Sequence, residues 1–176
     1  MNYDEARELI NSGDQIGVEY STPLAFIVRI VQRIAGLPED TRRITHTCTA
    51  WWVEGRLYSV EMDGMHNVLR PMSQIMGKAN ALHVYECPVP LKAMQDTFDI
   101  ATSNSISYSI VDLVRIGLRM VLGLPNGGDG DKSLVCSTFS ARWLEWAGWS
   151  RPSSVPNMPS PGEFCGALKL KFIVKG

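Results

Sequence analysis

The chain of 176 residues lacks closely spaced metal-ligand pairs. Its four cysteines form no C-x-x-C pair, and its three histidines are not spaced with them as helix or hairpin ligand pairs. Zinc sites and thioredoxin-type redox motifs depend on such spacings. The sequence therefore predicts no metal site and no cofactor, and it favours reduced, unpaired thiols.

The chain also lacks a charge excess, a long apolar run and a basic, apolar leader. It has 17 Lys and Arg against 18 Asp and Glu, for a net charge of −1, which argues against a nucleic-acid partner. Charged residues interrupt its two most apolar segments, Pro23 to Ala35 and Ile110 to Leu124, before they reach the roughly 20 residues needed to span a bilayer. We expect a soluble protein without a signal peptide or integral membrane segment.

What the chain does contain suits one globular domain over residues 1–176, since 45% of its residues are hydrophobic and 20% are charged. Turn signals and periodicity predict an alternation of short helices and strands. The predicted helices are Asp4–Asn11, Pro23–Ala35, Leu91–Ile100 and Tyr108–Leu122, and the predicted strands outside the central hairpin are Gln15–Tyr20, Ala81–Pro88 and Ala167–Val174.

The helix that starts at Pro23 has a clear amphipathic pattern. Thr22 is its expected N-cap, and Gly36 is its expected end. Its apolar positions recur with helical spacing, so we expect this stripe to pack on a sheet; the stripe comprises Leu24, Ile27, Val28, Val31 and Ile34.

A hairpin is predicted from two β-rich runs, Ile44–Val53 and Leu57–Met62, which the turn Glu54-Gly55-Arg56 separates. Alternation along the strands puts His46 on one face with carboxylates of the partner strand within reach. Either Glu61 or Asp63 is a candidate to orient the imidazole.

Cys136 lies at the predicted start of a helix in Leu134–Gly148. The partial positive charge at a helix N-terminus favours a thiolate, and a cysteine hydrolase needs a thiolate, an imidazole and a polar group that orients the imidazole. Cys136, His46 and Glu61 are candidates for these roles, with the Cys136 backbone N–H as an oxyanion donor. The alternative interpretation is a buried apolar cysteine. The glycine-rich segment Pro125–Asp131 is expected to form a loop that gates the site.

Four segments in this order resemble the circularly permuted NlpC-type papain-like peptidases of the YiiX-like group. They are GDQIGVEYSTPLAFIVRIVQ, ITHTCTAWWVEGRLYSVEMDG, LVCSTFSARWLEWAG and SPGEFCGALKLKFIV. The resemblance implies an α+β permuted papain-like fold in which an antiparallel sheet packs against helices that include the cysteine helix. It also implies His46 as base, Cys136 as nucleophile, Glu61 as the orienting residue, and Tyr20 and Tyr108 as substrate or oxyanion contacts.

The leading functional hypothesis is a thiol hydrolase that cleaves an amide bond in a cell-wall peptide through a cysteine acyl-enzyme. A second hypothesis is an acyltransferase or (thio)esterase acting on lipid acyl groups, with helix Ile110–Leu124 as part of the acyl pocket or a membrane-proximal surface. A third is a catalytically silent structural or binding module, such as a phage virion component. Peptidoglycan lies outside the cytoplasm, so the first hypothesis pairs with delivery by a phage, and the others also allow a cytoplasmic location.

Overall fold

The computed structural model describes residues 2–63, 66–103, 107–108, 110–124 and 133–176. Within these residues, eight strands form one sheet in the order β7-β6-β4-β3-β2-β1-β5-β8. Neighbouring strands are antiparallel except for the parallel pair β6 and β7. The strands are β1 (Gln15–Glu19), β2 (His46–Val53), β3 (Arg56–Asp63), β4 (His66–Pro71), β5 (Ala81–Tyr85), β6 (Ser107–Tyr108), β7 (Ser133–Leu134) and β8 (Leu170–Lys175).

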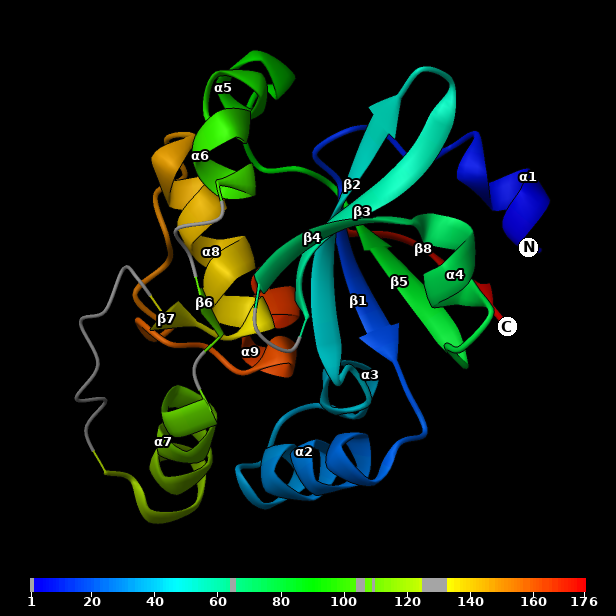
Figure 1. Ribbon diagram of the computed structural model, residues 1–176. Coiled ribbons are helices and arrows are strands. Elements are labelled where there is room, and N and C mark those ends of the chain that lie inside the picture. Colours follow the sequence, from blue (N-terminus) through cyan, green and yellow to red (C-terminus); the bar gives the residue numbers. More distant parts are fainter. Residues whose placement is uncertain (1, 64–65, 104–106, 109, 125–132) are drawn as a thin grey trace.

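Helices cover both faces of the sheet, with α8 on one side and α1 and α4 on the other (Figure 1). The pair α2 and α7 lies beyond the end of the sheet and projects from the rest of the molecule. The helices are α1 (Tyr3–Arg7), α2 (Pro23–Ile34), α3 (Glu39–Arg42), α4 (Met72–Met76), α5 (Leu91–Asp96), α6 (Phe98–Thr102), α7 (Ile110–Leu122), α8 (Cys136–Trp146) and α9 (Pro161–Gly166). None of the described helices combines the length and the apolar character needed to cross a membrane.

The alternation of side chains along the central strands produces two cores. On the α8 side, Trp51 packs in a cluster with Phe139 and Trp143 of the helix. On the other side, Ile16 and Leu82 pack with residues of α1 and α4. The expected α+β architecture, with a largely antiparallel sheet packed against helices that include the cysteine helix, is therefore confirmed.

The central hairpin is confirmed, but its turn is one residue shorter than predicted. Val53 pairs with Arg56, which leaves a two-residue turn of Glu54 and Gly55. Both turn residues have positive φ angles, 48° and 75°, as the twist of a two-residue hairpin requires. The register between β2 and β3 therefore differs by one position from the three-residue turn that we expected.

Several helices and strands differ from the predicted ones in their bounds or type. The predicted helix Leu91–Ile100 is two helices because the backbone departs from helical geometry at Thr97, whose hydroxyl accepts a hydrogen bond from Trp143 Nε1. Tyr108 belongs to β6 rather than to a helix, and β4 and α4 were not predicted. The first helix ends at Arg7 instead of Asn11. The expected gating loop, Pro125–Asp131, lies outside the described residues.

The expectation that the apolar stripe of α2 packs on a sheet was wrong. Thr22 caps the helix as predicted, but the residues that α2 buries are Ala25 and Gln32. Gln32 donates hydrogen bonds of 2.9 Å to the carbonyls of Arg42 and Ile44 and accepts one of 2.7 Å from the Gly162 N–H. Because a polar residue anchors the helix, its apolar stripe turns toward α7 and solvent.

Candidate active site

Cys136 is the first residue of α8, and it is buried, with 8% of its surface exposed. The residue before the helix, Val135, has no side-chain group that could cap it. The backbone N–H groups of Ser137 and Thr47 donate hydrogen bonds to the Cys136 sulfur. The Ser137 hydroxyl fixes the helix start by donating to the Pro159 carbonyl at 2.6 Å.

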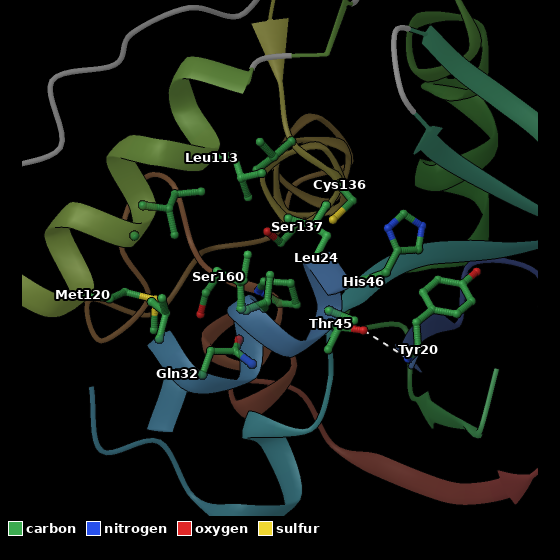
Figure 2. A pocket seen from close by; sticks show the side chains of 18 of the residues that line it. Tyr20, Leu24, Gln32, Thr45, His46, Leu113, Met120, Cys136, Ser137 and Ser160 are labelled. Carbon is green, nitrogen blue, oxygen red and sulfur yellow. Dashed lines mark hydrogen bonds between the residues drawn. The ribbon is translucent and has the colours of Figure 1, made fainter. Parts of the chain in front are cut away.

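His46 is the first residue of β2, directly opposite the start of α8. Its Nε2 atom lies 2.5 Å from Glu61 Oε2, and the structure also gives it a side-chain hydrogen bond with Cys136. Since Nε2 is held by the carboxylate, Nδ1 is the ring nitrogen left for the sulfur. Figure 2 shows the Cys136 sulfur and the His46 ring pointing toward one another at the edge of a pocket.

Both members of this pair have shifted pKa values. Burial lowers the pKa of His46, but the charge and hydrogen bond of Cys136 and those of Glu61 outweigh it and raise the pKa to about 10. Burial raises the pKa of the Cys136 thiol, but the charge and hydrogen bond of His46 and the two backbone N–H groups bring it below its ordinary value. The geometry therefore favours a thiolate–imidazolium ion pair.

The other cysteines have a different electrostatic environment. All four thiols are free, and burial raises the pKa values of Cys48 and Cys165 well above the ordinary range and raises that of Cys87 as well. Cys136 is the cysteine whose pKa is lowered, because its sulfur faces an imidazole and two N–H donors.

Of the two candidate carboxylates, Glu61 is the one at His46. It is 1% exposed, and Arg70 Nη1 lies 3.3 Å from its second oxygen. The Ser59 hydroxyl also lies 3.4 Å from this oxygen. Asp63, which is about half exposed, instead pairs with Arg70 Nη2. Asp63 therefore acts on the imidazole at most through Arg70.

The two tyrosines have different positions relative to the site. The Tyr20 ring lies 5.9 Å from the His46 ring, centroid to centroid, and burial raises the pKa of its phenol, which keeps it protonated. Its hydroxyl points away from Cys136 (Figure 2), so the geometry does not bring it to the sulfur as an oxyanion donor. Tyr108 lies in β6, where it pairs with Leu134 of β7, and its side chain is outside the described part of the structure.

A pocket with a cavity volume of about 360 Å³ opens onto Cys136 and His46. It lies between α2 and α7, and most of its lining is aliphatic (Figure 2). Among the described lining residues, none is an Asp, Glu, Lys or Arg. The principal apolar contributors are Leu24, Ile27, Val28 and Val31 of α2 and Leu113, Val114, Ile116 and Met120 of α7.

No protein-family model and no curated protein sequence matches this chain. Among solved structures, metalloprotein YiiX from Escherichia coli O157:H7, a DUF1105 protein, matches with a TM-score of 0.58 at 12% sequence identity, over 95% of this chain and 98% of that one. The fold is similar to that of YiiX. The YiiX-like part of the sequence expectation is thus supported at the level of fold, and the papain-like part stays a prediction.

YiiX is described as a metalloprotein. Among the described residues, no group of three or more His, Cys, Asp and Glu side chains is placed to hold a metal ion. His46 illustrates the reason, since its Nε2 is held by Glu61 and its other nitrogen faces Cys136. The donors at this site do not fit a metal, and we derive no metal-dependent step.

Sequence reasoning missed three contributors to the site. Arg70 was missed because β4, the strand that carries it, was not predicted. The available signal was the position of this segment directly after β3, where an antiparallel partner strand can form. The Thr47 N–H was missed because a backbone donor leaves no mark on the sequence. Gln32, which fixes α2 beside the pocket, is a polar residue within an apolar helix, and such a residue signals a buried anchor.

Proposed function

We propose that this protein is a cysteine hydrolase that transfers an apolar acyl group from an ester, thioester or amide to Cys136 and then to water. The observation that carries the proposal is the aliphatic pocket of about 360 Å³ that opens onto the Cys136–His46 pair. Apolar pockets with a few convergent polar groups are typical of ligand sites, and here the polar groups form a nucleophile and an acid.

In the first half of the reaction, the Cys136 thiolate attacks the acyl carbonyl carbon, and the C–O π electrons move to the oxygen. In this proposal the backbone N–H of Cys136, in the first turn of α8, stabilises the oxyanion. As the intermediate collapses, the bond to the leaving group breaks and the His46 imidazolium donates its proton to the departing oxygen, sulfur or nitrogen. The products are a Cys136 thioester, neutral His46 and a free alcohol, thiol or amine.

In the second half, neutral His46 takes a proton from a water molecule, which attacks the thioester carbonyl. Collapse of this intermediate releases the carboxylic acid and restores the Cys136 thiolate beside the protonated imidazole. The Glu61 carboxylate, 2.5 Å from Nε2, holds the ring with its other nitrogen toward the sulfur and stabilises each imidazolium state.

The composition of the pocket favours one of the substrate classes that the sequence suggested. A cell-wall peptide carries charged groups, whereas the described pocket lining offers no ionisable side chain apart from the catalytic pair and Tyr20. An acyl chain, by contrast, gains free energy from each methylene that leaves water for an aliphatic surface, about 0.8 kcal/mol. The pocket therefore favours the lipid acyl hypothesis over the peptide hypothesis.

The proposal is tested with p-nitrophenyl esters of acetate, hexanoate and dodecanoate, together with the corresponding acyl-coenzyme A thioesters. We expect kcat/KM to rise with chain length until the pocket is filled, and mass spectrometry after rapid acid quenching to find the acyl group on Cys136. Cys136→Ala is expected to abolish both signals. Cys87→Ala, which changes a half-buried cysteine away from the site, is the matched control.

Two results would contradict the proposal. Hydrolysis of muropeptides with no activity on any acyl ester would establish the peptide hypothesis instead. A second contradicting result would be a folded protein that forms no acyl-enzyme with any substrate and whose Cys136 is no more reactive than a free thiol. This result would favour the catalytically silent module.

A further inference from the structure

Helix α2 leaves most of its apolar surface in solvent. Phe26, Ile30 and Ile34 recur every four residues and thus lie on one face, with Ile27 beside them. These four side chains are between 41% and 61% exposed. Such a face is unusual on a helix that already has a buried side, because large apolar side chains normally find partners in the core.

Helix α7 repeats this arrangement. It buries Asp112 and Ile116 and turns its opposite face outward. The exposed fractions on that face range from 43% to 71%, for Ile110, Val111, Val114, Leu118, Val121 and Leu122. The apolar faces of the two helices together form what we call the α2–α7 face.

The α2–α7 face is continuous with the pocket. The two helices contact one another at the same end of the molecule (Figure 1). Leu24, Ile27 and Val114 are more than half exposed and also line the pocket. The pocket therefore opens between exposed apolar side chains, and an acyl chain entering it would cross the α2–α7 face first.

Positive charge borders this face. Helix α2 contains Arg29 and Arg33, one turn apart and next to Phe26, and it contains no Asp or Glu. Neither arginine forms an ion pair with a residue that the structure describes. Together with Arg42 of α3 and Arg43, which directly follows that helix, they line a shallow groove alongside Phe26 and Ile30.

Other arginines of the described residues near the face have carboxylate partners. Arg43, directly after α3, bonds Glu39. On α7, Arg115 pairs with Asp112 at 3.1 Å, and Arg119 pairs with Glu163 of α9. Among the described residues of α2 and α7, Arg29 and Arg33 are therefore the cations that form no ion pair.

We propose that the α2–α7 face docks on an anionic lipid bilayer surface, with its apolar side chains in the acyl boundary and Arg29 and Arg33 at the headgroup phosphates. Helices of this kind, apolar on one face with arginines beside it, lie in the membrane interface and bind through buried apolar area plus attraction to anionic lipid. A second copy fits less well, because α2 contains arginines and no Asp or Glu, so the α2 of a second copy would bring no acidic partner to Arg29 and Arg33. The docking itself does not depend on the proposed function. Its consequence, direct delivery of a lipid acyl chain to Cys136, does rest on that function.

The test is flotation of the protein with vesicles of phosphatidylcholine alone and of phosphatidylcholine mixed with phosphatidylglycerol. We expect binding to the mixed vesicles, weaker binding to the neutral ones, and release at high salt. The double variant Phe26→Ser/Ile34→Ser should bind about 100-fold more weakly, since each large side chain contributes about tenfold or more. Arg29→Gln/Arg33→Gln should lose about 30-fold on the mixed vesicles only.

Matched controls separate docking from unfolding and from catalysis. Ile100→Ser changes an equally exposed isoleucine on α6, at the other end of the molecule (Figure 1), and should bind vesicles like the parent. Arg56→Gln, in the hairpin, controls for loss of charge. Cys136→Ala should also bind like the parent, so a failure of the proposed chemistry leaves this test intact.

Three results would overturn the proposal: no flotation of the folded parent with either vesicle, equal flotation with both, or flotation that the Phe26→Ser/Ile34→Ser variant retains. Light scattering supplies a second, independent measurement. A stable dimer that becomes monomeric in this variant, without vesicle binding, would assign the α2–α7 face to a second copy instead.

Discussion

Replacing His46 with alanine tests the ion pair at the centre of the site. In the parent protein, His46 contributes a positive charge and a hydrogen bond that lower the Cys136 pKa, against burial that raises it. In His46→Ala, burial remains and only the N–H groups of Thr47 and Ser137 still favour the thiolate. The thiolate fraction in mildly acidic solution should therefore collapse.

The size of the effect follows from the contact that is lost. A hydrogen bond to a charged group contributes about 1.5 to 3 kcal/mol, which corresponds to a factor of about 10 to 150 in the thiolate population near pH 6. The alkylation rate of Cys136 by iodoacetamide should fall by this factor, because the thiolate is the reacting species. His66→Ala, at an exposed histidine of β4, should leave the rate unchanged.

The assay is a time course of labelling at pH 6, read by mass spectrometry after tryptic digestion. Cleavage at Lys and Arg places each cysteine in a separate peptide. Cys87 is an internal reference, and Cys48 and Cys165 should stay unlabelled until the protein is unfolded, because they are fully buried. Equal Cys136 rates in the parent and in a folded His46→Ala protein would refute the ion pair.

Three further predictions concern the carboxylates near His46, the pH dependence of the reaction and the packing around Gly162. Glu61→Gln should lower kcat/KM about tenfold, because a charge-assisted hydrogen bond to the imidazolium becomes a neutral one. Asp63→Asn should change kcat/KM less than about threefold, because the ion pair of Asp63 with Arg70 is partly exposed. The pH profile of kcat/KM should be bell-shaped. Activity should appear above the lowered Cys136 pKa and decline as pH rises through the His46 pKa of about 10. In Glu61→Gln the alkaline limb should shift to lower pH, because the negative charge that favours the imidazolium is gone. Gly162→Ala should lower the free energy of unfolding by about 1 to 3 kcal/mol, seen as a reduced Tm, because the new Cβ would lie 2.7 to 2.8 Å from atoms of Leu37, Gln32 and the Thr41 backbone; an unchanged Tm would contradict the close packing there.

The convergence of Cys136, His46 and Glu61 was predictable because most of it depends on local geometry. A hairpin fixes which side chains of β2 and β3 share a face, and an error of one residue in the turn still left Glu61 within reach of His46. Only the approach of α8 to β2 is a long-range contact, and the resemblance of segment order supplied it.

The surroundings of the triad were less predictable because they depend on contacts distant in sequence. Arg70 reaches Glu61 from β4, whose sequence has little strand character, and the Ser137 hydroxyl bonds a carbonyl 22 positions later. Neither contact has a period or a motif, so neither was predictable from composition and spacing.

Helix α2 shows why the pocket itself escaped prediction. Its amphipathic period correctly indicates a helix, but a period cannot tell whether an apolar stripe faces a sheet, a second helix or solvent. The deciding residue is Gln32, whose amide bonds to Arg42, Ile44 and Gly162 fix the helix with Gln32 and Ala25 inward. Once Gln32 occupies the buried side, the apolar side chains of α2 must lie outside the core, where they line the space before Cys136 and border the membrane-facing surface that we propose. The same residue thus positions one wall of the pocket beside Cys136 and exposes the apolar surface that leads into it.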